Sequence, residues 1–303
     1  MMSTGPHRSH NADTGHPTGS RLWLLGFILA AFGWRVHGLT VESLWRDEVD
    51  AVYFALRDLP QTLSMFVSTG QKGALYFLSL RPWLQTVGSS EYALRYPSVL
   101  AGVLCVPLVW QVGRKLLFAQ NEDGESDWFM STVAPLGAAA LIAVNPYQLW
   151  YSQEGKMYSI IVAQALLASW LWLRGVGRGN RNGAWKYWVG YLVVATLSIY
   201  SHLLMILMLP VHVVWYVIGW PQTRASWRGY LGAIAGLTLP YLPMLIWQWD
   251  LLMATTKKTG YSFTPLPRVL EVLLDNHTTG FMPDVSTIWY APIYFVASVS
   301  YTH

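Results

Sequence analysis

Long apolar segments alternate with short polar segments along most of the chain. A helix needs about 20 mostly apolar residues to cross a bilayer, and this pattern predicts spans at residues 22–39, 93–112, 128–153, 157–173, 229–249 and 285–303. Residues 187–223 contain no Lys, Arg, Asp or Glu. At about 1.5 Å rise per residue this run is too long for one span, so we divide it near Ser201 and His202. The pattern predicts an all-α polytopic membrane helix bundle of about eight spans.

The polar segments divide the chain further. Residues 1–20 are rich in Gly, Ser, Pro and His and predict a disordered cytoplasmic tail. Residues 21–303 then form one transmembrane domain, which we expect to be C-terminally incomplete because the sequence stops inside an apolar run. The loop 41–92 is mixed in charge, and its apolar stretch 73–80 is too short to span. A juxtamembrane helix lying along the membrane surface fits that stretch.

Composition agrees with a lipid-facing protein. Hydrophobic residues make up 53% of the 303 residues and charged residues only 12%, against about 25% charged in a soluble domain. The 17 Trp and 17 Tyr suit the membrane interface. No run of basic residues suggests nucleic acid, so the bilayer itself is the expected partner. The single cysteine allows no intrachain disulfide.

Basic residues predict the orientation. The loops 113–127, 174–186 and 221–228 carry most of the Lys and Arg residues between predicted spans. All three are cytoplasmic if the N-terminus is inside and the run 187–223 forms two spans, as the positive-inside rule expects. We therefore expect a multi-pass protein of the cell membrane. The segments 41–92 and 250–284, with the turns near 153 and 202, would then lie outside the cytoplasm and hold the active site.

Two adjacent acids follow the first span. Asp47 and Glu48 have two readings of equal weight: solvated charges beside the membrane, or a catalytic carboxylate at the lipid–water boundary. A carboxylate in such a place can take the proton of an attacking hydroxyl.

Cations share the predicted outer side. Lys72 could bind a lipid phosphate or extend to the headgroups, and Arg95, at the start of a span, could simply anchor the helix at the interface. Glu154 and Lys156 occupy a very short turn, where the pair could be structural. Arg35 lies near the outer end of the first span, and we expect it to extend towards the headgroups.

Four stretches follow one another in order: residues 45–48 (WRDE), 72–76 (KGALY), 95–98 (RYPS) and 145–158 (NPYQLWYSQEGKMY). Together they resemble the GT-C superfamily of membrane glycosyltransferases, in the bacterial branch related to family 39 protein O-mannosyltransferases and the lipid A aminoarabinose transferase. The resemblance extends over roughly residues 22–220. Gly73 and Ala74 replace a proline pair of the family and loosen the backbone. Lys156 replaces an arginine, which keeps the charge without the bidentate geometry.

The resemblance implies transfer of a sugar from a polyprenyl-phosphate-linked donor to an acceptor hydroxyl, with inversion. Asp47 would be the general base, and Glu48 would orient it or bind the sugar. Lys72 would bind the donor phosphate, helped by Arg95 and Lys156, because cations stabilise the charge of the leaving phosphate. The acceptor, whether a glycan, a lipid or a protein, is not defined by the sequence.

The same resemblance adds substrate-binding candidates. Glu154 would position the acceptor or a basic partner, and Tyr158 and His202 would contact substrate, although helix packing alone accounts for a histidine at position 202. The segment 250–284 could cover the site as a lid. We expect no cofactor, nucleotide sugar or metal ion.

Two other functions compete with this one. A transporter usually carries charges in the middle of its spans, whereas here the charges gather in the loops. An inactive or truncated scaffold of the same fold would keep the helices and lose turnover. The abrupt end and the missing proline pair are compatible with that alternative.

Overall fold

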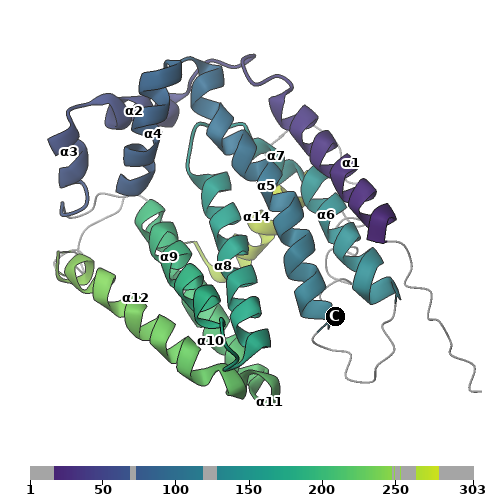
Figure 1. Ribbon diagram of the computed structural model, residues 1–303. Coiled ribbons are helices and arrows are strands. Elements are labelled where there is room, and N and C mark those ends of the chain that lie inside the picture. The colour runs from purple at the N-terminus through teal and green to yellow at the C-terminus, as the bar shows by residue number, and fades with distance from the viewer. Residues whose placement is uncertain are drawn as a thin grey trace, which may run out of the picture.

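The computed structural model describes residues 17–68, 73–118, 128–247 and 264–279, with the isolated residues 249 and 253. Every regular element within this part of the chain is a helix, which confirms the predicted class. The long helices run beside one another, and short helices cover one end of them (Figure 1).

The first half of the bundle is built around one long helix. This helix, α5 (Glu91–Phe118), packs against α1 (Pro17–Val36), α6 (Ala134–Val144) and α8 (Tyr158–Arg178). Small residues such as Ala139 lie fully buried where α1, α5 and α6 meet, so these helices approach closely, as membrane helices commonly do.

The second half of the bundle extends from α8 to α9 (Trp185–Ser201), α10 (Met208–Ile218) and α12 (Trp227–Trp247). Its core is aromatic. The rings of Trp172 and Tyr230 lie 6.1 Å apart at nearly a right angle, and other Trp and Tyr rings surround them.

Three short helices form a cap over one end of the bundle: α2 (Arg46–Leu56), α3 (Leu59–Ser64) and α4 (Ala74–Val87). They occupy the predicted loop 41–92, and α4 contains the predicted surface helix 73–80. α2 packs on α4. The cap has its own apolar core, which also takes in the buried Leu94 at the start of α5.

The predicted span 128–153 is broken. A π-helical turn, η1 (Phe129–Val133), leads into α6, and α7 (Pro146–Ser152) then departs at 54°. Pro146 cannot donate the backbone hydrogen bond that would continue α6. The side chain of Asn145 caps α7 by accepting a hydrogen bond from the Gln148 N–H at 2.8 Å.

A second break confirms the division at His202, where α9 ends at Ser201 and the 3-10 helix η2 (Leu203–Leu207) begins. After Gly219 the chain bends again, by 93°, through α11 (Trp220–Thr223) and η3 (Arg224–Ser226) into α12.

Fewer helices than the eight predicted spans are long and apolar enough to cross a membrane in the described part of the chain. Within the described ranges, Glu91–Leu116 and Tyr158–Arg178 are long and apolar enough to cross a membrane, and up to four segments qualify if each bent pair is one span. The predicted span 285–303 lies outside the described residues. Residues 1–16 of the predicted tail 1–20 also lie outside the described residues. The last four residues of that tail belong to α1, which begins at Pro17.

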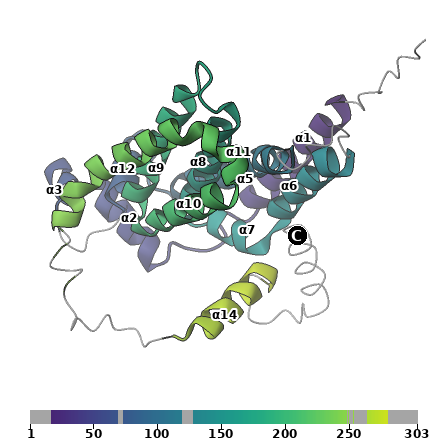
Figure 2. The ribbon, with the colours of Figure 1, turned by 90° about the horizontal axis from the view of Figure 1, so that it is seen from below.

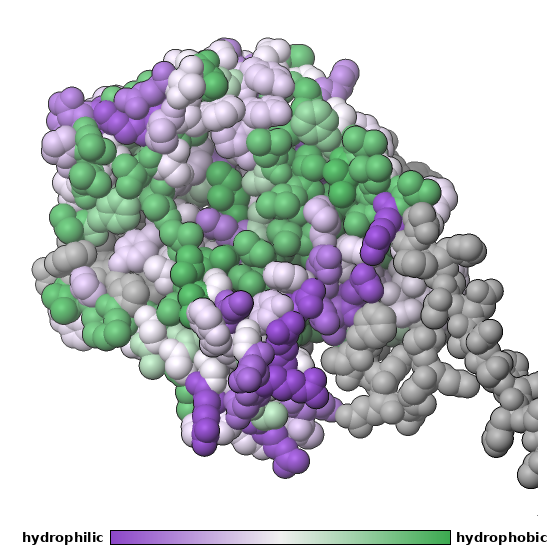
Figure 3. Space-filling view, in the orientation of Figure 1, coloured by the Kyte–Doolittle hydropathy of each residue, from purple (hydrophilic) through white to green (hydrophobic). Residues whose placement is uncertain are grey.

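The surface of the molecule is banded. Figure 3 shows polar side chains gathered at two ends, with a broad apolar band between them. Arginines at the end away from the cap lie on aromatic rings: Arg174 is 5.0 Å from the centre of Trp170, and Arg178 is 5.0 Å from that of Tyr187. This banding is what a bilayer-embedded bundle requires, and the multi-pass membrane assignment follows from it together with the apolar helices.

One helix stands apart from the bundle. Among the described elements, α14 (Leu266–Thr279) packs mainly on α7 (Figure 2). His277 near its end stacks on Tyr147 at 5.1 Å and lies 3.1 Å from the Asn145 amide nitrogen. The part of the predicted lid 250–284 that the structure describes is therefore an amphipathic helix attached beside α7.

Candidate active site

The short turn between α7 and α8 is held in place by three distant segments. The Gly155 N–H donates to Glu48 Oε1 at 2.6 Å, and the Tyr76 hydroxyl donates to the Gly155 carbonyl at 2.8 Å. The Ser98 hydroxyl donates to the Lys156 carbonyl at 2.8 Å. One residue from each of the first three sequence motifs thus binds the fourth motif, so the four motifs form one structure.

Glycine is required at the centre of this turn. A Cβ on Gly155 would lie 2.5 Å from Leu94 Cγ and 3.2 Å from Glu48 Oε1. Leu94 is fully buried, so its side chain would have to shift within the core to admit a methyl group on residue 155. The close approach is what allows the backbone N–H of the turn to reach the Glu48 carboxylate.

Glu48 is also joined to Arg95 by a bidentate ion pair. Arg95 Nε lies 2.8 Å from Oε1 and Nη2 lies 2.7 Å from Oε2. The remaining N–H groups donate to the carbonyls of Leu39, Glu42 and Ser43. All five donors of the guanidinium are therefore used inside the protein. Arg95 ties the segment after α1 to α5, and it offers no free donor to a phosphate.

Asp47 has a different environment from its neighbour. Successive helical residues point about 100° apart, so Asp47 faces outward and keeps 44% of its side chain exposed, while Glu48 is fully buried. Asp47 Oδ2 lies 4.0 Å from Lys156 Nζ. Burial lowers the pKa of the Lys156 ammonium, and the nearby carboxylates, Asp47 first among them, oppose that shift. Asp47 is thus an accessible carboxylate beside a cation.

Glu154 is partly buried in the same turn. Its Oε1 accepts a hydrogen bond from Trp150 Nε1 at 2.7 Å, and its buried Oε2 has no hydrogen-bond partner among the described residues. The pKa of Glu154 is raised to about 7, mainly by burial, and the hydrogen bond from Trp150 opposes this shift. The charges of Glu48 and Asp47 raise this pKa further, and Lys156 lowers it. Glu154 can therefore change its protonation state near neutral pH.

Arg35 corrects a sequence expectation. It was expected to extend towards the headgroups, but its side chain is fully buried. Its Nε donates to Ser152 Oγ at 3.1 Å, and Nη1 and Nη2 donate to the carbonyls of Ala143 and Ile142 at 3.0 and 3.2 Å. These carbonyls end α6 and have no helical partner beyond the break. A charge inside a predicted span was the available signal, because such charges usually face the bundle interior.

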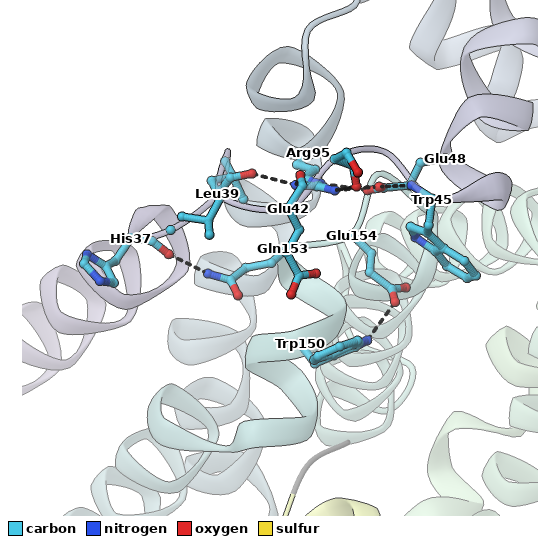
Figure 4. Close-up of a pocket in the computed structure, with 12 residues that line it drawn as sticks. His37, Leu39, Glu42, Trp45, Glu48, Arg95, Trp150, Gln153 and Glu154 are labelled. Atoms are coloured by element: carbon cyan, nitrogen blue, oxygen red, sulfur yellow. Dashed lines mark hydrogen bonds and ion pairs between the residues drawn. The ribbon is translucent and has the colours of Figure 1, made fainter. Parts of the chain in front are cut away.

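A pocket of about 570 Å³ opens beside this turn (Figure 4). The segment after α1 forms one wall, and α7 with Gln153 forms another; the Gln153 amide donates to the His37 carbonyl at 2.8 Å. Two indole rings and three carboxylates contribute to the lining: Trp45, Trp150, Glu42, Glu48 and Glu154. Asp47 and Lys156 do not line this pocket.

The other two substrate-binding candidates lie close to each other. The rings of Tyr158 and His202 are 6.5 Å apart. The His202 Nδ1 also accepts a hydrogen bond from the Leu204 N–H at 3.3 Å, so this histidine caps the start of η2 as well. Tyr158 packs in turn on Tyr151, at 4.8 Å between ring centres.

The predicted phosphate ligand Lys72 lies outside the described residues. The next residue, Gly73, is near Met157 and the Ser201 carbonyl, and its φ of 76° begins α4 in the left-handed region. Proline is held near −65°. The proline that the resemblance places at this position could not adopt the conformation of Gly73.

A family model described as dolichyl-phosphate-mannose-protein mannosyltransferase matches residues 73–247, more than half of the chain. The chain belongs to this mannosyltransferase family. Membership indicates a membrane glycosyltransferase with a dolichyl-phosphate-type sugar donor. No curated protein and no solved structure gives a significant match to the chain.

The family match covers the third and fourth motifs and all of the second except Lys72. It begins at Gly73, so the segment with Asp47 and Glu48 precedes it, and the contacts of Glu48 with Arg95 and Gly155 connect that segment to the matched region. No group of three His, Cys, Asp or Glu side chains that could hold a metal ion occurs in the described part of the chain. The absence of a cofactor remains a prediction.

Proposed function

We propose that this chain transfers a sugar from a polyprenyl-phosphate donor to an acceptor hydroxyl at the extracytoplasmic membrane surface, with inversion. The observation that carries the proposal is the convergence of all four motifs on the turn after α7, with an exposed carboxylate, Asp47, beside the cation Lys156. The bacterial branch related to the lipid A aminoarabinose transferase remains our assignment within the family, on the motifs alone.

In the proposed step the acceptor oxygen attacks the anomeric carbon while its proton passes to the Asp47 carboxylate. The bond between that carbon and the phosphate oxygen breaks, and its electron pair stays on the phosphate. Lys156 stands 4.0 Å from Asp47 and would stabilise this charge. Lys72 would share that role, by its place in the motif. Attack opposite the leaving phosphate inverts the anomeric centre.

The contacts redistribute the remaining roles. Glu48 and Arg95 are buried and bonded to each other, so we assign both to positioning the turn and α2. Glu154 lines the pocket and would bind sugar, while Tyr158 and His202 would contact the acceptor. The arginines at the end away from the cap would face the cytoplasm under the positive-inside rule, which puts the cap and the site outside.

The test is transfer of radiolabelled sugar from polyprenyl-phosphate donors in membranes that contain the chain. Asp47→Asn should lower transfer by about 10²- to 10⁴-fold, the usual contribution of a general base. Asp58→Asn is the matched control, because Asp58 is an exposed acid of the same cap and caps no backbone group with its side chain. Transfer that survives Asp47→Asn would show the general-base assignment to be wrong. If the wild-type chain transfers no sugar at all, the scaffold alternative takes its place.

A further inference from the structure

We propose that the pocket between the segment after α1 and α7 binds the ring of a neutral sugar, and that the donor phosphate binds elsewhere. This inference rests on the proposed function, because it names the part of that reaction's substrates that the pocket takes. Two observations support it. The lining is aromatic and rich in hydrogen-bond acceptors, and the guanidinium of its arginine, Arg95, is fully bonded within the protein.

The lining disfavours an anion. Three carboxylates contribute to it, Glu42, Glu48 and Glu154, and Arg95 is the only Lys or Arg among its described lining residues. The five donors of Arg95 are already bonded to Glu48 and to backbone carbonyls. Glu48 is neutralised by Arg95, but a phosphate in this pocket would still meet the carboxylates of Glu42 and Glu154 and no free guanidinium donor.

The same lining suits a carbohydrate. A pyranose ring presents a face of C–H groups and an edge of hydroxyls, so it needs an apolar flat surface beside hydrogen-bond acceptors. Trp45 and Trp150 provide indole rings, and Trp45 keeps 46% of its surface exposed. The Trp150 ring is fixed by its bond to Glu154 at 2.7 Å. Figure 4 shows the Glu154 carboxylate between the two rings in that view.

An unused acceptor marks where a hydroxyl would bind. Glu154 Oε2 is buried and has no hydrogen-bond partner among the described residues, and buried polar atoms are normally paired. Glu154 lines the pocket, so a sugar hydroxyl bound beside it would supply the donor that this oxygen lacks. The volume of about 570 Å³ lies within the range of small-molecule sites, about 300–1,000 Å³.

Two sources could supply the sugar ring: the sugar carried by the donor, or a glycan acceptor. Both present the same chemistry to the indoles and carboxylates. The pocket adjoins the turn that carries Lys156, whose ammonium lies outside the lining. A donor with its phosphate at Lys156 could place its sugar in the pocket, and so could an acceptor glycan that approaches Asp47. The lining does not distinguish these two sources, so kinetic measurements must.

Direct binding tests the pocket independently of transfer. The probe is methyl α-mannopyranoside, with mannitol as an acyclic polyol that lacks a ring face, observed by saturation-transfer difference NMR on the full chain in detergent. The mannoside should give a saturation signal and mannitol should not. Trp45→Ala should weaken mannoside binding about tenfold, the value of one well-placed aromatic contact. Trp227→Ala, which removes an equally exposed indole at the start of α12, should leave it unchanged.

A second measurement separates the outcomes. Inorganic phosphate should not displace the mannoside; displacement, absence of a mannoside signal from the wild-type chain, or equal binding by Trp45→Ala would each overturn the inference. In transfer assays, a raised KM for the donor in Trp45→Ala assigns the pocket to the donor's sugar, and a raised KM for the acceptor assigns it to the acceptor glycan. Mannoside binding without any sugar transfer would contradict the proposed function but would still support a sugar-binding pocket.

Discussion

Glu48 and Arg95, separated by 47 positions in the sequence, form a bidentate ion pair at 2.7 and 2.8 Å that is buried at the base of the candidate site. The pair is also bonded to the backbone on both sides, through the Gly155 N–H and through carbonyls of the segment after α1. A buried ion pair is stabilising only when its other hydrogen-bonding groups are satisfied, and here they are.

Glu48→Gln should destabilise the fold strongly. The amide would turn donor hydrogens towards Arg95 and leave its guanidinium charge buried without a counter-charge, which costs about 3–5 kcal/mol. The measurement is the temperature of half-aggregation of detergent-solubilised protein, which we expect to fall well below the wild-type value. Adding Arg95→Lys should not restore it, because an ammonium has three donors in place of five.

The control for this prediction is Glu271→Gln. It breaks the exposed pair between Glu271 and Arg268 on α14, whose atoms lie 2.7 Å apart. Exposed pairs contribute little to stability, so the aggregation temperature should not move. Equal shifts in both variants would mean that the Glu48–Arg95 pair has no special structural role.

Gly155→Ala should displace the turn that carries Glu154 and Lys156. The added methyl group would overlap Leu94, at 2.5 Å from Cγ, and press on Glu48 Oε1. We expect lower thermal stability and lower transfer together, because the same contact sets the fold and the site. Gly137→Ala on α6 is the matched control, since a Cβ there meets no atom within 4 Å, and it should be neutral or slightly stabilising.

A double variant sharpens that test. Leu94→Ala alone creates a cavity and should destabilise, but it also removes the atoms that a methyl group on residue 155 would strike. The effects of Gly155→Ala and Leu94→Ala should therefore be less than additive, as expected for residues in direct contact. Strict additivity would contradict the steric explanation.

The helical class and several element boundaries could be predicted from the sequence, because apolar run length is a strong signal. The break at His202 was predicted from the length of the apolar run, in agreement with the loop charges, and is confirmed. The 54° bend at Asn145 was not predicted, although Pro146 was its visible cause. The apolar run continues through the proline, and a count of apolar residues takes no account of a missing backbone donor.

The grouping of several candidate site residues could be predicted, and their roles stay predictions. Order and spacing of the motifs identified Asp47, Glu48, Arg95, Glu154 and Lys156, and the structure places these residues around one turn. Their separate roles could not be read from spacing, because the direction of each side chain decides them. Asp47 and Glu48 are neighbours on α2 and point in different directions, so Asp47 is exposed and Glu48 is fully buried. The pocket walls at Trp45 and Trp150 became visible only in the structure.

Arg35→Gln should weaken the junction between α6 and α7. Arg35 donates to Ser152 and to the final carbonyls of α6, and a shorter amide cannot reach all of them. Each buried acceptor left unpaired costs about 1–3 kcal/mol, so the aggregation temperature should fall clearly. Arg21→Gln, at an exposed position of the same helix, should have no effect. An unchanged temperature for Arg35→Gln would mean that water or lipid replaces these bonds without cost.

Glu154 should make stability depend on pH in a direction opposite to that of an ordinary carboxylate. Its pKa is raised from 4.5 to about 7, mainly by burial. Below 4.5 the group is protonated in both folded and unfolded chains and has no effect. Between 4.5 and about 7 the unfolded chain loses this proton more readily than the folded chain, so folding becomes less favourable as pH rises. Above 7 the full penalty is present.

Glu154→Gln removes this titration and keeps an acceptor for Trp150, whose Nε1 lies 2.7 Å from the native Oε1. The aggregation temperature of the variant, relative to wild type, should therefore rise with pH between 4.5 and about 7 and then level off. Asp58→Asn, a substitution at an exposed position of the cap, is measured beside it as the control variant. A constant offset between Glu154→Gln and wild type over that pH interval would mean that Glu154 titrates as a solvated carboxylate, and the buried, half-paired geometry described for it would be wrong.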